Sequence, residues 1–138
     1  MPFIEIITDA KSQSQLSKAI SKRTVKNADI LYVKEKNLEN IKNIKLETLV
    51  INRKIENTEL IERILKNTKH VIVNIDFNEE LGKVNKNTIT FGYSSKADIT
   101  ISSVKEEEVM ICIQNTINSI YGEKIGEQEV KVNINKRY

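Results

Sequence analysis

The first 75 residues alternate short apolar runs with stretches of helical periodicity, and this pattern constrains the fold more than any other feature. The apolar runs cover residues 3–7, 29–33, 47–51 and 71–75. Strands that alternate with helices pair in parallel through crossover connections. Nearly continuous apolar strands are buried on both faces of their sheet. We therefore predict an α/β fold, a Rossmann-like three-layer sandwich with a mostly parallel sheet.

The stretches between the runs carry signs of helices. Ser12 and Gln15 have the spacing of a capping box, in which both side chains hydrogen-bond free backbone N–H groups at a helix start. Apolar residues follow at helical spacing there and after the second and third runs. They are Leu16, Ala19 and Ile20, then Leu38 and Ile41, and then Leu60, Ile61, Ile64 and Leu65 behind an Asn57 cap.

The pattern changes after Asp76. Residues 88–91 and 98–102 are predicted strands so close in sequence that they favour an antiparallel hairpin or an extension of the sheet edge. Ser103 and Glu106 form a second capping box and predict a helix that ends at Gly122. The apolar face of that helix would carry Val109, Cys112, Ile113, Thr116, Ile117 and Ile120. Residues 128–134 alternate polar and apolar residues, which is typical of a short edge strand with one wet face.

Length and composition favour one soluble domain over residues 1–138. The chain has a single proline, no low-complexity linker and an ordinary balance of 39% apolar and 30% charged residues. No apolar run approaches the length of a membrane span, and the N-terminus lacks a secretory pattern. One cysteine, Cys112, cannot form an internal disulfide framework. We therefore expect a cytoplasmic protein that does not bind membranes.

Glycine is absent from the first 81 residues, which limits the nucleotide sites that the chain can form. Phosphate-binding loops between a strand and a helix use glycine so that backbone N–H groups can approach the phosphate. Both GxxxxGK[ST] and GxGxxG are missing. His70, the only histidine, has no Cys or carboxylate at ligand spacing. We therefore predict no catalytic residue, no metal site and no required cofactor, and we favour a protein that is not an enzyme.

Asp76 follows the fourth apolar run, where ligands of open α/β sheets bind. Its carboxylate could accept hydrogen bonds from a ribose, or it could cap the turn that follows. Asn74, inside the run, could orient a ligand or satisfy backbone groups of a neighbouring loop. Together with Gly92, these are the candidate cofactor-binding residues, and ATP or another nucleotide is the candidate ligand.

A family resemblance rests on three short segments in order. They are Asn74-Ile75-Asp76, Thr90-Phe91-Gly92 and Ala97-Asp98. Their order and spacing resemble the end of the central ATP-binding domain of Mur ligases, the ATP-dependent amino-acid ligases of cell-wall precursor synthesis. Phe77 stands where that family has a second Asp, and the family's P-loop, metal-binding residues and C-terminal domain are missing. The resemblance implies a Mur-ligase-like fold without ligase activity, in which Asn74 and Asp76 would lie at a nucleotide edge.

Three hypotheses for function follow. The first is a non-catalytic, Mur-ligase-like α/β domain that acts through a protein partner or by self-association, because the alternating C-terminal strand offers an edge for pairing. The alternative is a small-molecule, nucleotide-binding domain with its site near Asp76. A second alternative is weak nucleic-acid binding through the region from Lys11 to Lys45, which holds nine Lys or Arg and three Asp or Glu. We favour a solvated surface over nucleic-acid binding, because the basic residues are scattered.

Overall fold

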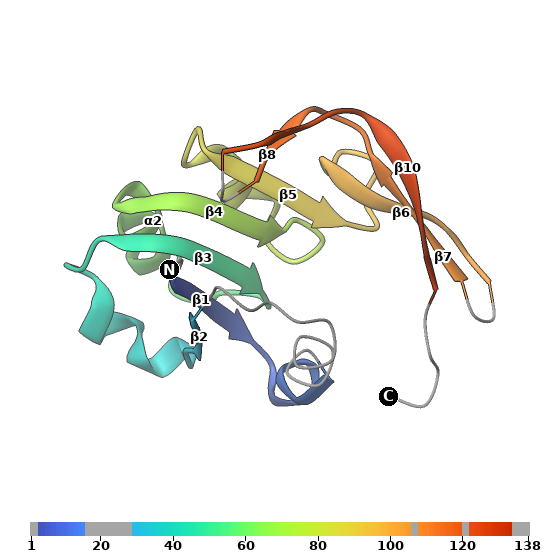
Figure 1. Ribbon diagram of the computed structural model, residues 1–138. Coiled ribbons are helices and arrows are strands. Elements are labelled where there is room, and N and C mark those ends of the chain that lie inside the picture. Colours follow the sequence, from blue (N-terminus) through green and yellow to red (C-terminus); the bar gives the residue numbers. More distant parts are fainter. Residues whose placement is uncertain (1–2, 16–28, 106–107, 120–121, 134–138) are drawn as a thin grey trace.

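The computed structural model describes residues 3–15, 29–105, 108–119 and 122–133 (Figure 1). Eight strands form one sheet: β1 (Phe3–Thr8), β2 (Asp29–Tyr32), β3 (Leu46–Asn52), β4 (Thr68–Asn74), β5 (Thr88–Gly92), β6 (Ile99–Val104), β7 (Glu108–Ile113) and β10 (Gln128–Asn133). A separate pair consists of β8 (Ile117–Asn118) and β9 (Lys124–Ile125). The helices with defined bounds are η1 (Glu35–Ile41), α2 (Thr58–Lys66) and η2 (Glu79–Lys83).

The strand order is β2-β1-β3-β4-β5-β6-β7-β10. Neighbouring strands from β2 to β6 are parallel, whereas β7 pairs antiparallel with both β6 and β10. The predicted Rossmann-like α/β fold with a mostly parallel sheet is therefore confirmed. The antiparallel strands β6, β7 and β10 form a lobe that bends away from the parallel strands (Figure 1).

Helical segments lie on both faces of the parallel strands. The connections from β1 to β2 and from β3 to β4 run in opposite directions along the strand order, so right-handed crossovers place them on opposite faces. α2 and the two 3-10 helices lie on one side, which we call the α2 face, and the helical turn at residues 10–15 lies on the other (Figure 1). No helix in the described ranges is both long and apolar enough to cross a membrane.

The main core lies on the α2 face. The buried core includes Ile7, Leu49, Ile51, Val71 and Val73 from the sheet and Ile61, Ile64 and Leu65 from α2. Full burial of such a side chain contributes about 1.5–3 kcal/mol. As predicted, Asn57 caps α2, because its side chain accepts a hydrogen bond from the backbone N–H of Leu60 at 3.1 Å. The opposite face of the sheet is less covered, and Val50, Ile72 and Phe91 are only half-buried there.

The first helix begins earlier than the capping box predicted. Residues 10–15 are helical, and the cap is Asp9 instead of Ser12. The Asp9 carboxylate accepts hydrogen bonds from the backbone N–H and the hydroxyl of Ser12, each at 2.8 Å. The predicted continuation through Leu16, Ala19 and Ile20 lies outside the described residues.

The predicted helix after Ser103 is wrong, because residues 108–113 form strand β7. The segment Val109-Met110-Ile111-Cys112-Ile113 is apolar at every position, so it satisfies a helical pattern and a two-sided strand equally well. The segment forms a strand because it pairs with β6 on one side and with β10 on the other. Glu106 lies outside the described residues.

Of the two arrangements predicted for residues 88–91 and 98–102, the antiparallel hairpin is wrong, and the second strand instead extends the sheet. β5 and β6 are parallel, and only two residue pairs join them, Phe91 with Ile99 and Gly92 with Thr100. A six-residue connection is too short for a helix, so β6 starts beside the end of β5 and extends beyond it. The predicted edge strand at residues 128–134 is confirmed, since β10 (Gln128–Asn133) is the last strand of the sheet.

Glu5 provides a test of this packing. Its side chain is 7% exposed, its Oε2 has no hydrogen-bond partner among the described residues, and burial raises the pKa of its carboxyl group. Because the pKa of Glu5 is raised in the folded state, its contribution to the free energy of unfolding is fully present below about pH 4.5, where the carboxyl group is protonated. This contribution is lost as the pH rises through the pKa of the folded state. We predict that Glu5→Gln stabilises the protein at pH 7, on the order of 1–2 kcal/mol.

The gain from Glu5→Gln should shrink as the pH is lowered toward 4.5. Chemical denaturation at several pH values measures it, with Glu56→Gln at an exposed position as the matched control. A gain that is independent of pH would contradict burial of the charged form as the cause.

Candidate functional site

Polar side chains at the ends of three neighbouring parallel strands are hydrogen-bonded in a row, which we call the edge ladder. Thr8 ends β1, Asn52 ends β3 and Asn74 ends β4. The Nδ2 of Asn52 donates to Oγ1 of Thr8 at 3.1 Å, and the Nδ2 of Asn74 donates to Oδ1 of Asn52 at 3.0 Å. The Oδ1 of Asn74 then accepts from the backbone N–H of Asp76 at 3.0 Å. The ladder therefore follows the carboxyl edge of the sheet.

Asp76 extends the ladder to the turn after β5. Its two carboxylate oxygens accept hydrogen bonds from the backbone N–H groups of Tyr93 (2.7 Å) and Ser94 (3.0 Å). Gly92 precedes these groups with a φ of 145°, a conformation that favours glycine. A Cβ atom at Gly92 would lie 2.7 Å from both carboxylate oxygens. Asp76 therefore caps the turn after β5, which begins at Gly92, and not the turn directly after Asp76 that was predicted as its structural role.

The ladder retains hydrogen-bonding capacity. Among the described residues, the Nδ2 atoms of Asn52 and Asn74 each donate one hydrogen bond, although a carboxamide has two N–H hydrogens. Each carboxylate oxygen of Asp76 accepts one hydrogen bond and has a second lone pair. The edge therefore presents two donors and an anionic acceptor in addition to the bonds that hold it together.

An apolar hollow of about 280 Å³ adjoins the ladder. By strand register, Asn74, Phe91, Ile99, Ile101 and Ile111 share the face opposite α2. All five line the hollow, as do Asp76, Gly92, Tyr93 and Thr100. The hollow lies where the antiparallel lobe leaves the parallel strands, and the sequence prediction found its polar end but missed its apolar wall.

The start of the first helix carries a negative charge where many α/β proteins bind phosphate. The hydrogen bonds from Ser12, first from its backbone N–H and then from its hydroxyl, hold the pKa of the Asp9 carboxyl group below its usual value. Asp9 is therefore ionised at neutral pH and already accepts a hydrogen bond from one backbone N–H group of the helix start, that of Ser12. It also repels any further anion.

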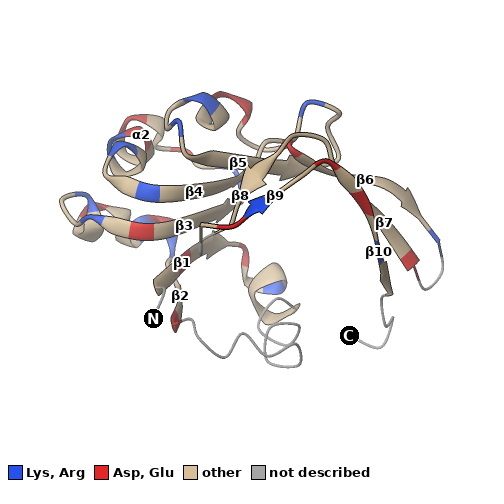
Figure 2. Ribbon diagram, turned by 45° about the horizontal axis from the view of Figure 1, so that its top comes forward, with Lys and Arg blue, Asp and Glu red and all other residues tan. Residues whose placement is uncertain are grey.

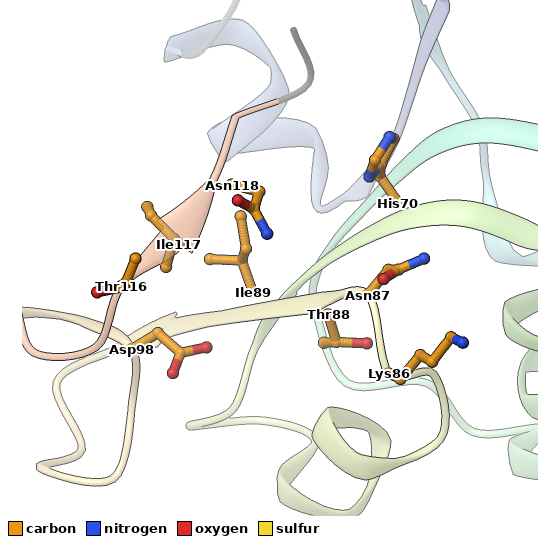
Figure 3. A pocket seen from close by; sticks show the side chains of 9 residues that line it. All are labelled: His70, Lys86, Asn87, Thr88, Ile89, Asp98, Thr116, Ile117 and Asn118. Carbon is orange, nitrogen blue, oxygen red and sulfur yellow. The ribbon is translucent and has the colours of Figure 1, made fainter. Parts of the chain in front are cut away.

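A second cavity, of about 220 Å³, lies at the other end of β5 and contains the only histidine (Figure 3). Its lining residues are His70, Lys86, Asn87, Thr88, Ile89, Asp98, Thr116, Ile117 and Asn118. Both carboxylate oxygens of Asp98 are engaged, one by the backbone N–H of Thr90 at 2.9 Å and one by Nδ2 of Asn115 at 2.9 Å. This cavity lies at the amino edge of the sheet, away from the carboxyl edge at which α/β proteins bind ligands.

Asn78 is a structural residue that the sequence prediction did not identify. It is 1% exposed, its Oδ1 accepts from the backbone N–H of Ile55 at 3.0 Å, and its Nδ2 donates to the carbonyl of Arg53 at 2.6 Å. It therefore joins the loop after β3 to the loop after β4, just beyond the ladder. Within the described ranges, no three His, Cys, Asp or Glu side chains are grouped so that they could hold a metal ion.

The basic region from Lys11 to Lys45 is only partly within the described residues. Four of the nine Lys and Arg residues between Lys11 and Lys45 fall within 16–28, outside the described residues. In the described part, charges of both signs are interspersed over the surface (Figure 2). Nucleic-acid binding through this region stays a prediction.

Comparisons with known proteins support the fold. No protein-family model matches the chain, and no curated protein matches it by sequence. Two crystal structures of S. aureus homoserine dehydrogenase are similar, one at pH 7.5 (TM-score 0.50, 19% identity) and one at pH 7.0 (TM-score 0.48, 20% identity). Each match covers 83% of this chain but only 36% and 35% of the respective dehydrogenase chain. The chain therefore spans about a third of those structures, and the match with a TM-score of 0.50 supports a shared Rossmann-like fold.

The resemblance to Mur ligases is wrong. The similar structures are homoserine dehydrogenases, and no family or sequence match supports a ligase. The segments that suggested it close this chain's own turns: Asp76 binds the turn after Gly92, and Asp98 exchanges two hydrogen bonds with Thr90, at 2.9 and 2.8 Å. Asp, Thr and Gly recur at such strand ends because of local turn chemistry.

The Asp76–Gly92 turn predicts a coupled effect on stability. Gly92→Ala places a Cβ against the carboxylate and strains the backbone, so we expect a loss of about 1–3 kcal/mol. When Asp76→Ala is present, the clash is gone and the added cost of Gly92→Ala should fall. A double-mutant cycle by denaturant unfolding measures this coupling.

Gly126→Ala is the matched control for the Gly92 cycle. No atom lies within 4 Å of a Cβ built at Gly126, so the change should be nearly neutral. If the stability losses of Gly92→Ala and Asp76→Ala were additive, contact between the new Cβ and the Asp76 carboxylate would not be the cause of the loss at position 92.

Proposed function

We propose that this domain binds a small molecule with a planar, nucleoside-like ring in the hollow beside the edge ladder. The observation that carries the proposal is the junction of an apolar hollow with a row of partly unused hydrogen-bonding groups at Asn52, Asn74 and Asp76. Ligand sites in proteins combine apolar walls with a few polar groups in this way. The hollow, at about 280 Å³, suits a small ligand.

The lining suggests how such a ligand would bind. A planar ring can pack against Phe91 and the isoleucines of the lobe, because aromatic and aliphatic side chains provide most of the contact area in such sites. The second N–H hydrogen of Asn74 would then donate to a ring nitrogen or carbonyl. Asp76 would accept from a ribose hydroxyl or an exocyclic amine. These contacts select for a ligand that carries both acceptors and donors.

The position of the hollow supports the proposal. In open α/β sheets, ligands bind outside the carboxyl ends of the strands, at the point where the strand order reverses. The polar end of the hollow, Asn74 and Asp76, lies at the carboxyl end of β4. The order reverses at the far end of the ladder, between β1 and β3, where Thr8 bonds to Asn52. The likeness in fold to homoserine dehydrogenase, an enzyme by name, is consistent with a ligand at this edge. We propose binding alone and no reaction.

The charge on Asp9 disfavours ligands that place a phosphate near the start of the first helix. A phosphorylated ligand that extends from the hollow along the ladder toward β1 would approach the ionised carboxylate at the helix start. Like charges repel over several ångströms, more strongly at low salt. A nucleoside, or a ligand with its phosphate directed elsewhere, should therefore bind better than one whose pyrophosphate follows the ladder.

Binding assays test the proposal. We expect saturable binding of at least one of adenosine, guanosine, cytidine and uridine, measured by thermal shift and then by calorimetry. Asn74→Leu should weaken it about tenfold or more, because it removes a hydrogen-bond donor beside an apolar wall. Asn118→Leu, an exposed change at the other cavity, is the matched control.

A further variant separates binding from folding. Ile101→Phe fills the hollow without touching the ladder, and it should abolish binding while the protein remains folded by circular dichroism. A panel of nucleosides without any response, or binding that survives both Asn74→Leu and Ile101→Phe, would contradict the proposed site.

The role of Asp9 is tested separately. Asn is as good a helix cap as Asp, so Asp9→Asn should keep the helix and remove the charge. We expect this variant to bind a nucleoside diphosphate about threefold more tightly at low salt, while nucleoside binding is unchanged. Asp29→Asn, which removes a charge on β2, is the control. An equal gain for nucleoside and diphosphate would refute electrostatic exclusion by Asp9.

A further inference from the structure

Strand β10 is the last strand at one edge of the eight-stranded sheet. Among the described residues, no strand pairs with its outer side. It is six residues long and contains neither proline nor glycine, whereas β2, at the opposite edge, has four residues. Native proteins usually shorten, charge or interrupt such an edge, because its free N–H and C=O groups accept another strand. β10 has only one of these protections, the charges of Glu129 and Lys131.

The two faces of β10 differ in character. Val130 and Val132 lie opposite Ile111 and Val109 of β7, so they extend the apolar face of the lobe. Val130 is 37% exposed. Glu129 and Lys131 project from the other face, where Nζ of Lys131 lies 3.6 Å from a carboxylate oxygen of Glu108. A strand with one apolar and one charged face can pair with a second strand that has the same two faces.

We propose that β10 pairs antiparallel with β10 of a second copy of this chain, around a two-fold axis that passes beside Val130. In this register Val130 faces its own counterpart, and Glu129 of each copy faces Lys131 of the other. Opposite charges on directly facing residues stabilise an antiparallel pair, and like charges destabilise it. The charges that protect the edge thereby become part of the contact.

The two symmetric registers on either side of this one are electrostatically unfavourable. An axis beside Lys131 would place two lysines directly opposite each other, and an axis beside Glu129 would do the same for two glutamates. An axis beside Val132 would place Lys131 opposite Asn133 and bring no opposite charges together. Among these registers, only the axis beside Val130 places each charge opposite one of the other sign. The contact would be isologous and would join the two sheets into one. This inference does not depend on the ligand proposed above, and it names a second copy as the partner expected from the sequence.

Cysteine cross-linking tests the register. In a Cys112→Ser background, Val130→Cys places two thiols on facing residues, whose Cα atoms are about 4.5–5.5 Å apart in an antiparallel pair. This separation allows a disulfide. Two cysteines from Val132→Cys would lie about 14 Å apart along the strands, beyond disulfide reach. We expect a covalent dimer on oxidation for Val130→Cys alone. Cross-linking of Val132→Cys but not Val130→Cys would overturn the proposed register.

Charge reversal tests the contact in solution by light scattering and sedimentation. We expect the full chain to be a dimer and Lys131→Glu to weaken dimerisation about tenfold or more, because two attractive pairs become repulsive. The double variant Glu129→Lys with Lys131→Glu restores both pairs and should restore the dimer. Lys124→Glu in β9 is the matched control. A wild-type chain that stays monomeric at all concentrations, or a dimer unaffected by Lys131→Glu, would overturn the proposal.

Discussion

The hydrogen bonds along the edge ladder are the interaction on which the arrangement of the strand ends depends. Thr8, Asn52 and Asn74 belong to three neighbouring strands, and each bonds to the next. Asp76 then binds the turn after β5. These groups replace water at an edge where backbone and side-chain polar groups would otherwise need it. The same row of groups both fixes the relative position of the loops and provides the polar end of the hollow, so structure and candidate function share residues.

The parallel half of the fold could be predicted because its signals are local and redundant. Apolar runs, helical spacing and the Asn57 cap agree with one another, and the structure has a strand or helix at each of these signals that lies within its described residues. The C-terminal half was harder, because Val109 to Ile113 is apolar on every side and its identity as a strand depends on pairing with β6 and β10. The parallel pairing of β5 with β6 had no local signal either, since it depends on a two-residue overlap at the strand ends.

The candidate site was predicted only in its polar part. Asn74, Asp76 and Gly92 could be found because they interrupt an apolar run, follow it or permit an unusual turn, and the structure places them in contact. The joint role of Asp76 and Gly92 in a turn could not be predicted from their spacing, since Gly92 is 16 positions after Asp76. The apolar wall and Asn52 come from other strands and meet the rest only through the sheet register. The cap at Asp9 was missed for a different reason: its partner Ser12 is close in sequence, but Ser12 and Gln15 themselves had the spacing of a capping box.

The two-pair overlap between β5 and β6 also affects how the molecule should unfold. The parallel strands have their core against α2, whereas the antiparallel lobe is held together mainly by its own three strands. Between them, the sheet is continuous through only Phe91 with Ile99 and Gly92 with Thr100. Segments joined by so few bonds tend to open as separate cooperative units. Backbone amides of β6, β7 and β10 should therefore exchange with solvent deuterium together, and earlier than those of β3 and β4.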